Sequence, residues 1–127
     1  MPLLKGLREM NIKICKAKIS DLKTVTELCM ILYEAKDYNY LENENKRLLQ
    51  NKNQAIFLAF DDEKAVAFAH CSLRFDYVES TNSSPAGYLE GIYVEPKYRN
   101  QGLAKKLVTE LIGARHELMN LYNIEYK

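Results

Sequence analysis

The chain has 127 residues, of which 47% are hydrophobic and 28% are charged, with five glycines and three prolines. This length and composition fit one compact domain and exclude intrinsic disorder, a collagen-like repeat and a disulfide-rich scaffold. Eighteen Lys and Arg against seventeen Asp and Glu leave a net charge of +1, so we expect neither nucleic acid nor a membrane as a partner.

The N-terminal part of the chain predicts one strand followed by two helices. Residues 11–18 alternate isoleucine with lysine, a period typical of a short strand. Ser20 is the expected N-cap of an amphipathic helix over residues 21–33, where apolar side chains recur at helical spacing. Residues 40–51 predict a second and weaker helix.

The middle of the chain predicts three consecutive strands. Residues 55–60 and 65–75 are apolar runs separated by the acidic turn 61–64, which together indicate a strand–turn–strand unit. Residues 78–87 are rich in Ser, Asn and Pro and predict a loop. Residues 88–94 then predict the third strand.

The last part of the chain predicts a long helix over residues 103–120 and the beginning of another strand at residues 122–127. The order is therefore β-α-α-β-β-β-α-β, in a single domain that covers residues 1–127. Because strands that follow one another in sequence usually pair antiparallel, this order predicts a mixed α/β (α+β) fold. Its central sheet is expected to be largely antiparallel and flanked by helices.

The cysteines and histidines indicate no metal site and no disulfide framework. Cys15, Cys29 and Cys71 are an odd number of widely spaced residues without a CxxC pair, and His70 and His116 lie far apart in the chain. We therefore expect free thiols, which are typical of a reducing compartment, and no bound metal.

The beginning of the chain favours a cytoplasmic protein. Residues 1–9 are too short and too charged for a signal peptide, and they form an extension ahead of a second candidate start at Met10. No apolar run approaches the roughly 20 residues that span a bilayer.

Residues 89–108 predict an anion site at the start of a helix. The strand ends at Pro96, and Gly102 lies where the backbone must bend or approach a ligand closely. The first N–H groups of the following helix lack intrahelical partners, and the helix dipole adds a partial positive charge there. Arg99 and Lys105 add cations, so this end suits a phosphate. On these residues alone a second interpretation stays open, in which Gly102 only relieves a turn and the lysines are solvated.

The string from Arg99 to Ala104, RNQGLA, resembles the acetyl-CoA-binding motif of the GNAT N-acetyltransferase superfamily, which is Q or R, two residues, G, one residue, then G or A. The order of expected elements from residue 10 onward resembles that family as well. The resemblance implies acetyl-CoA as co-substrate, with its pyrophosphate on the N–H groups of this turn and its pantetheine arm along the preceding strand. The residues it implies at the cofactor are Ile92, Tyr93, Val94, Arg99, Asn100, Gln101, Gly102, Leu103, Ala104 and Lys105.

Within this superfamily, residues 72–78 and 84–94 resemble bacterial aminoglycoside 6'-N-acetyltransferases, which transfer acetyl from acetyl-CoA to the 6'-amine of an aminoglycoside. The resemblance implies acceptor contacts at Tyr77 and Glu90, and at Tyr33, where this subgroup usually carries Trp. Taken without the resemblance, Tyr77 is equally open to a role in packing at a strand end, and Glu90 to a role as a salt-bridged strand carboxylate.

Three carboxylates near the central strands, Asp76, Glu79 and Glu90, suit a polycationic acceptor because they can orient its ammonium groups. Acetyl transfer needs a neutral amine, so we expect Glu90 to be the catalytic group that accepts the proton, directly or through water. Strand alternation predicts that Glu90 shares a face with Ile92 and Val94, toward the expected acceptor.

The resemblance also implies that the chain is incomplete at its C-terminus, because members of the family continue beyond Lys127 with a helix and further strands. We expect a truncated sheet edge and an incompletely covered last helix. This favours a homodimer, unless the helix rearranges to cover the core of a monomer. Three functions stay open. They are an aminoglycoside acetyltransferase, a non-catalytic relative that binds CoA or only self-associates, and a protein or peptide N-acetyltransferase.

Overall fold

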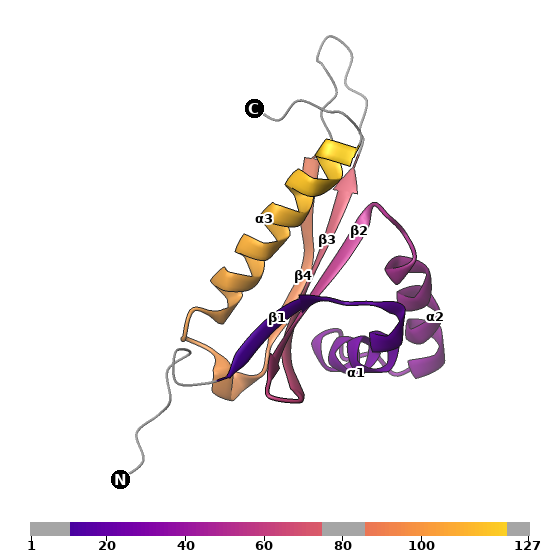
Figure 1. Cartoon of the computed structure of the whole chain (residues 1–127). Helices are drawn as coiled ribbons and strands as arrows, with labels where there is room; N and C mark the ends of the chain where they lie inside the picture. Colours follow the sequence, from indigo (N-terminus) through magenta and orange to yellow (C-terminus); the bar gives the residue numbers. More distant parts are fainter. Residues whose placement is uncertain (1–10, 75–85, 122–127) are drawn as a thin grey trace.

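In the part of the chain that the structure describes, a four-stranded sheet carries helices on both of its faces (Figure 1). The computed structural model describes residues 11–74 and 86–121. The strands lie in the order β1-β2-β3-β4, and each is antiparallel to its neighbours. The elements are β1 (Ile12–Lys16), the 3₁₀ turn η2 (Ile19–Asp21), α1 (Leu22–Leu32), α2 (Tyr38–Leu49), β2 (Gln54–Asp61), β3 (Lys64–Arg74), β4 (Ala86–Val94), the 3₁₀ turn η3 (Pro96–Tyr98) and α3 (Leu103–Leu121).

This architecture confirms the predicted mixed α/β fold with a largely antiparallel central sheet. Within the described part of the chain, each predicted helix and strand is present, and its ends differ from the prediction by at most two residues. The strand expected at residues 122–127 lies outside the described residues, as does the extension at residues 1–9.

The two helices after β1 begin differently from the prediction. Ser20 is not the N-cap of α1, because it lies inside the turn η2, where the Asp21 carboxylate accepts a hydrogen bond from the Lys18 N–H at 2.8 Å. Helix α2 begins two residues earlier than expected, since the Asp37 carboxylate accepts from the Tyr40 N–H at 3.0 Å and caps it. A carboxylate at this position also interacts favourably with the helix dipole.

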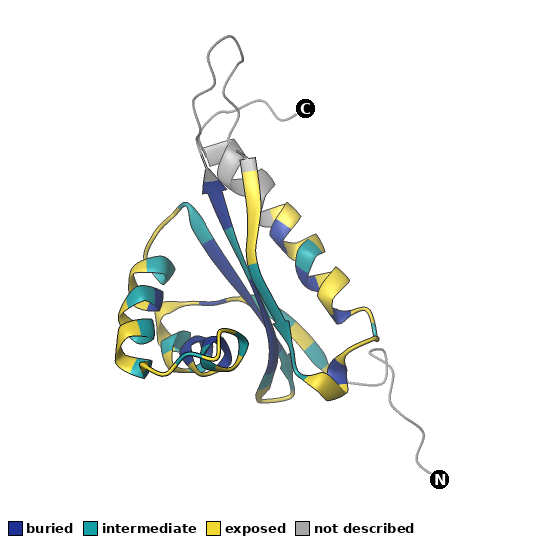
Figure 2. Cartoon of the chain, turned by 180° about the vertical axis from the view of Figure 1, so that it is seen from behind, coloured by how far each residue is buried: buried dark blue, intermediate teal, exposed yellow. Residues whose placement is uncertain are grey.

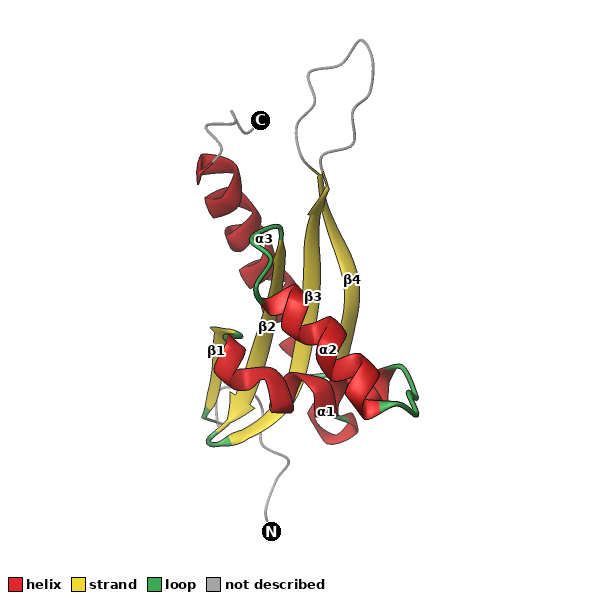
Figure 3. Ribbon diagram, turned by 90° about the vertical axis from the view of Figure 1, so that its right-hand side faces the viewer, coloured by secondary structure: helices red, strands yellow, loops and turns green. Residues whose placement is uncertain are grey.

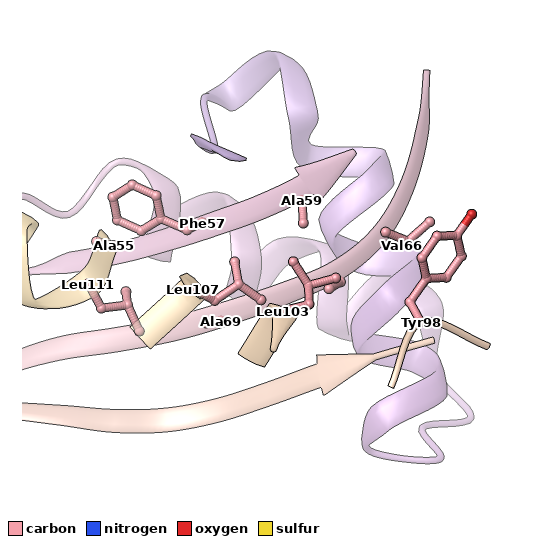
Figure 4. Packing of buried hydrophobic residues seen from close by; sticks show 10 residues of the cluster. Ala55, Phe57, Ala59, Val66, Ala69, Tyr98, Leu103, Leu107 and Leu111 are labelled. Atoms are coloured by element: carbon pink, nitrogen blue, oxygen red, sulfur yellow. The ribbon is translucent and has the colours of Figure 1, made fainter. Parts of the chain in front are cut away.

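Two apolar clusters, one on each face of the sheet, hold the helices in place. Helix α3 covers one face with the buried Leu103, Leu107 and Leu111 (Figures 1 and 4), while α1 and α2 cover the other, where Val25 and Leu28 are buried (Figure 3). Side chains alternate along a strand, so β2 and β3 serve both clusters and are the most buried part of the chain (Figure 2). Each fully buried leucine contributes about 2 kcal/mol of transfer free energy.

A β-bulge interrupts the pairing of β3 with β4. His70 lies opposite Gly91, whereas the next residue, Cys71, lies opposite Leu89, so Glu90 is the extra residue of β4 at this point. A bulge of this kind shifts the alternation of side chains by one position. It lies in the exposed part of β4, drawn in yellow in Figure 2.

Candidate active site

The turn between β4 and α3 presents a row of main-chain N–H groups. Asn100 and Gly102 have φ angles of 63° and 83°, in the left-handed region that asparagine tolerates and glycine adopts without steric cost. Among the described residues, the six N–H groups from Asn100 to Lys105 donate no intramolecular hydrogen bond; the helical series begins with Lys106 N–H to the Gly102 carbonyl at 3.1 Å. Donors of this kind, at the positive end of α3, form a site for a phosphate-like anion.

A cavity of about 570 Å³ opens at this turn. Of the residues predicted at the cofactor, the structure brings together along its wall Ile92, Tyr93, Val94, Arg99, Asn100, Gly102, Leu103, Ala104 and Lys105. Gln101 is the exception, because its side-chain Nε2 donates to the Lys97 carbonyl at 3.2 Å inside the turn. Leu32 and Tyr98 complete the wall. The cavity therefore extends from the end of β4 to the first turn of α3.

The far edge of β4 presents main-chain groups to this cavity. The Glu95 N–H donates to the Val66 carbonyl at 2.8 Å and so points toward β3. By the alternation of an antiparallel ladder, the N–H and C=O groups of Ile92 and Val94 point away from β3. Arg99 confirms this direction, since its Nε donates to the Val94 carbonyl at 2.7 Å.

The prediction that Glu90 shares a face with Ile92 and Val94 is wrong. Ile92 and Val94 pack against the apolar cluster beneath α3, as does Cys71 of β3. The neighbour of Cys71, Ser72, therefore faces the opposite side, and its hydroxyl donates a hydrogen bond to the Glu90 carboxylate. The bulge accounts for the error, because the extra residue turns Glu90 to the side of the sheet covered by α1 and α2.

His70 lies on this same side of β3. Its Nε2 is 2.7 Å from Oε1 of Gln54. Burial lowers the pKa of His70, and the negative charge of Glu90 opposes the shift only in part. The imidazole is therefore uncharged at neutral pH, and it is a second group near Glu90 that can accept a proton.

Tyr33, at the C-terminal end of α1, reaches the same region. Its side chain is 51% exposed. Its hydroxyl lies against Gly91, so closely that a Cβ on this glycine would collide with it. Burial is the main cause that raises the pKa of Tyr33, and the negative charge of Glu90 adds to it, so the hydroxyl stays protonated and can donate a hydrogen bond. Two predicted acceptor residues from distant parts of the chain, Tyr33 and Glu90, thus lie on one face.

The other predicted acceptor residues, Asp76, Tyr77 and Glu79, lie outside the described residues, between β3 and β4. Four residues near the site were not predicted for it: Leu32, His70, Ser72 and Tyr98. In the sequence Leu32 is one more apolar residue of an amphipathic helix. Ser72 becomes visible only through its register with β4, which no local pattern reports.

Among the residues that the structure describes, no group of His, Cys, Asp and Glu side chains is arranged to hold a metal ion. None of the described helices combines the length and the apolar character of a membrane span. The three cysteines, Cys15, Cys29 and Cys71, are free thiols. Burial raises the pKa of Cys29 to about 11, which keeps it protonated and unreactive at neutral pH.

Sequence comparison relates the chain to one group of proteins. The model of the acetyltransferase (GNAT) family matches residues 22–125. The aminoglycoside N(6')-acetyltransferase type 1 of Acinetobacter haemolyticus is 40% identical over 101 residues, which cover 80% of this chain and 68% of that protein. The protein of the same name from Salmonella typhimurium is 43% identical over 65 residues, which cover 51% of this chain and 45% of that protein. These matches therefore span between about half and two thirds of the relatives' lengths.

Solved structures give the same result. The aminoglycoside acetyltransferase AAC(6')-Iy, in complex with the bisubstrate analogue CoA-S-monomethyl-acetylneamine, superposes with a TM-score of 0.75 at 30% identity, over 84% of this chain and 73% of that one. The 6'-N-acetyltransferase AAC(6')-IG of Acinetobacter haemolyticus superposes with a TM-score of 0.73 at 34% identity, over 83% of this chain and 72% of that one. Sequence and fold thus point to the same set of proteins.

Proposed function

The chain belongs to the GNAT acetyltransferase family, and we propose that it transfers an acetyl group from acetyl-CoA to the 6'-amine of an aminoglycoside. The observation that carries the proposal is the row of main-chain N–H groups without intramolecular partners at the β4–α3 turn, where Asn100, Gly102, Leu103, Ala104 and Lys105 line the cavity. The relatives support it, because they are named aminoglycoside N(6')-acetyltransferases and one solved relative holds an analogue of CoA joined to an aminoglycoside fragment.

Acetyl-CoA fits the described residues in two places. Its pyrophosphate suits the N–H groups from Asn100 to Lys105, where the α3 dipole and the ammonium of Lys105 add positive charge. Its pantetheine arm carries amides that suit the outward main-chain groups of Ile92 and Val94. Because Arg99 already occupies the Val94 carbonyl, the arm pairs with the other groups of this edge or displaces the guanidinium.

On the acceptor side, carboxylates suit an aminoglycoside because it is a polycation. In the proposed reaction the amine nitrogen forms a bond to the thioester carbonyl carbon, the carbon–sulfur bond breaks, and sulfur takes up a proton from solvent. The amine proton goes to Glu90, directly or through water, with Ser72 holding the carboxylate. Tyr33 contacts the acceptor in this proposal, and Asp76, Tyr77 and Glu79 are proposed as further acceptor contacts.

We further propose that the chain is one domain and acts as a homodimer in the cytoplasm. Leu89 and Ile112 are each 50% exposed and flank a small apolar hollow between β4 and α3, which a second copy can cover. Free thiols are typical of a reducing compartment.

Neomycin and paromomycin form a matched pair of acceptors for the test, because they differ in carrying an amine or a hydroxyl at the 6' position. We expect release of the CoA thiol from acetyl-CoA with neomycin and not with paromomycin, together with a mass increase of one acetyl group on neomycin. Equal release with both compounds contradicts 6'-specific transfer.

A second candidate function is a non-catalytic relative that binds CoA, because the N–H groups of the β4–α3 turn and the cavity beside them account for cofactor binding without any acceptor group. Calorimetric binding of CoA without thiol release on neomycin or on peptides favours this candidate. Thiol release with a lysine-containing peptide and not with neomycin favours protein acetylation. Absence of both CoA binding and turnover contradicts each of these functions and leaves only a relative that self-associates.

A further inference from the structure

Tyr98 connects the β4–α3 turn to the end of the β2–β3 hairpin. It is the last residue of η3, only 3% exposed, and it packs in the cluster beneath α3 (Figure 4). Its hydroxyl donates a hydrogen bond of 2.6 Å to the Asp61 carboxylate at the end of β2. This contact joins two segments that are far apart in the sequence.

Both partners of this contact are held firmly. Asp61 pairs with Ile12 of β1 on one side and with Lys64 of β3 on the other, so its backbone belongs to the sheet. The Tyr98 N–H donates to the Glu95 carbonyl at 2.8 Å. The hydrogen bond to Asp61 raises the pKa of Tyr98 to about 12, so the hydroxyl remains a donor throughout the physiological range.

Tyr98 directly precedes the turn that carries the N–H donors, so its contact with Asp61 can hold that turn in place. The turn that begins at Arg99 follows directly, with Asn100 and Gly102 in left-handed conformations, and Tyr98 itself lines the cavity. Main-chain donors bind an anion well when they are already aimed at it, because no reorganisation is then needed on binding.

We propose that the Tyr98 hydroxyl and the Asp61 carboxylate form a positioning pair that fixes the β4–α3 turn against the sheet and so preorganises its N–H donors for the pyrophosphate of CoA. This inference rests on the proposed function. Tyr98 acts here through the turn, as a positioning residue.

Tyr98→Phe tests the pair because it removes the hydroxyl and retains the buried ring. We expect CoA, measured by calorimetry on the full chain, to bind roughly 5- to 10-fold more weakly, the loss typical of one hydrogen bond. Asp61→Ala should weaken the binding of CoA to the same extent, and the double variant should bind CoA no more weakly than either single variant. Asp61→Asn retains an acceptor oxygen, so its affinity should stay within about twofold of the wild type.

Lys64→Met is the matched control. It removes the exposed ion pair with Glu95 at 3.0 Å, at the same end of the molecule, and should leave CoA affinity unchanged. Thermal midpoints of all variants are measured in parallel. Wild-type affinity in Tyr98→Phe overturns the inference, even if the midpoint falls, because the pair is then only structural.

Amide hydrogen exchange supplies a readout that needs no ligand. Exchange at Arg99 and Lys106, whose N–H groups donate to the Pro96 and Gly102 carbonyls on either side of the turn, should be faster in Tyr98→Phe and in Asp61→Ala than in the wild type, and it should return to the wild-type rate in Asp61→Asn. Unchanged exchange in Tyr98→Phe overturns the inference. A wild-type chain that fails to bind CoA contradicts the proposed function, whereas the exchange rates still decide whether the pair positions the turn.

Discussion

The hydroxyl of Ser72 on β3 donates a hydrogen bond to the carboxylate of Glu90 on β4. Ser72 is buried, and Glu90 is the extra residue of the bulge that breaks the regular pairing of the two strands. The contact therefore depends on an irregularity of the sheet, and it directs the proposed catalytic carboxylate to the same side as His70 and Tyr33.

Glu90→Gln should lower kcat for neomycin by about 10²- to 10⁴-fold, because the amide cannot accept the amine proton. CoA affinity should stay unchanged, since Glu90 is absent from the wall of the cavity. Ser72→Ala should give a smaller loss of kcat, and Ser72→Thr should recover most of it by retaining a hydroxyl. Steady-state kinetics and calorimetry measure the two effects separately, and an equal loss of CoA binding would show that Glu90 is structural.

Gly102→Val should abolish measurable binding of CoA. At a φ of 83° a β-branched residue is strained, so the turn must change its conformation and lose the alignment of its N–H groups. Gly113→Ala is the control, because a Cβ there meets no atom within 4 Å in the exposed middle of α3. It should leave CoA affinity intact and stabilise the fold by about 0.8–1 kcal/mol. Calorimetry and urea unfolding check both, and wild-type CoA affinity in Gly102→Val refutes the assignment of the turn.

Gly91→Ala should raise KM for neomycin several-fold, because it displaces the Tyr33 side chain that we propose contacts the acceptor. CoA affinity should stay within about twofold of the wild type. The added Cβ collides with the Tyr33 hydroxyl, while its contact with Leu32 at 3.5 Å is an ordinary one. In a Tyr33→Ala background the same substitution should have no further effect on KM. A full effect in that background would mean that Gly91 acts on something other than Tyr33.

His70 should make the protein less stable in mild acid. Its folded pKa is lowered by burial below the ordinary 6.5, so the unfolded chain takes up a proton that the folded chain excludes. The free energy of unfolding therefore shows no loss from His70 above about pH 7, and it decreases as the pH falls toward the folded pKa of His70. Urea unfolding of the wild type and of His70→Gln between about pH 5 and pH 7.5 measures the difference. Parallel stability curves for the two proteins contradict the prediction.

Ile112→Glu should convert the proposed dimer to a monomer, because it places a charge beside the apolar hollow that a second copy covers. Ile19→Glu, at a residue that is 47% exposed in η2, is the control and should leave the dimer intact. Light scattering after size-exclusion chromatography gives the masses. A wild-type monomer at high concentration rules out the dimer.

Much of the fold follows from local patterns. The helical spacing of residues 21–33 identifies a helix with one apolar face, the continuous apolar run 55–60 identifies a strand buried on both faces, and the structure confirms both. The ends of these elements were less predictable. Ser20 was expected to cap α1, but it lies inside the turn η2, which comes before the helix and which the local pattern does not predict.

The cofactor side and the acceptor side of the candidate site differ in how far the sequence alone determines them. The turn from Arg99 to Ala104 lies within a few residues of one chain, and its glycine, the start of its helix and its N–H groups are local features that the sequence specifies. The face that Glu90 occupies, and the roles of Ser72 and Tyr98, were decided only by the tertiary structure. Glu90 and Ser72 depend on the register of β3 with β4 and on one bulge, while Tyr98 depends on how η3 packs against the end of β2. Both are set by the packing of whole faces rather than by neighbouring residues.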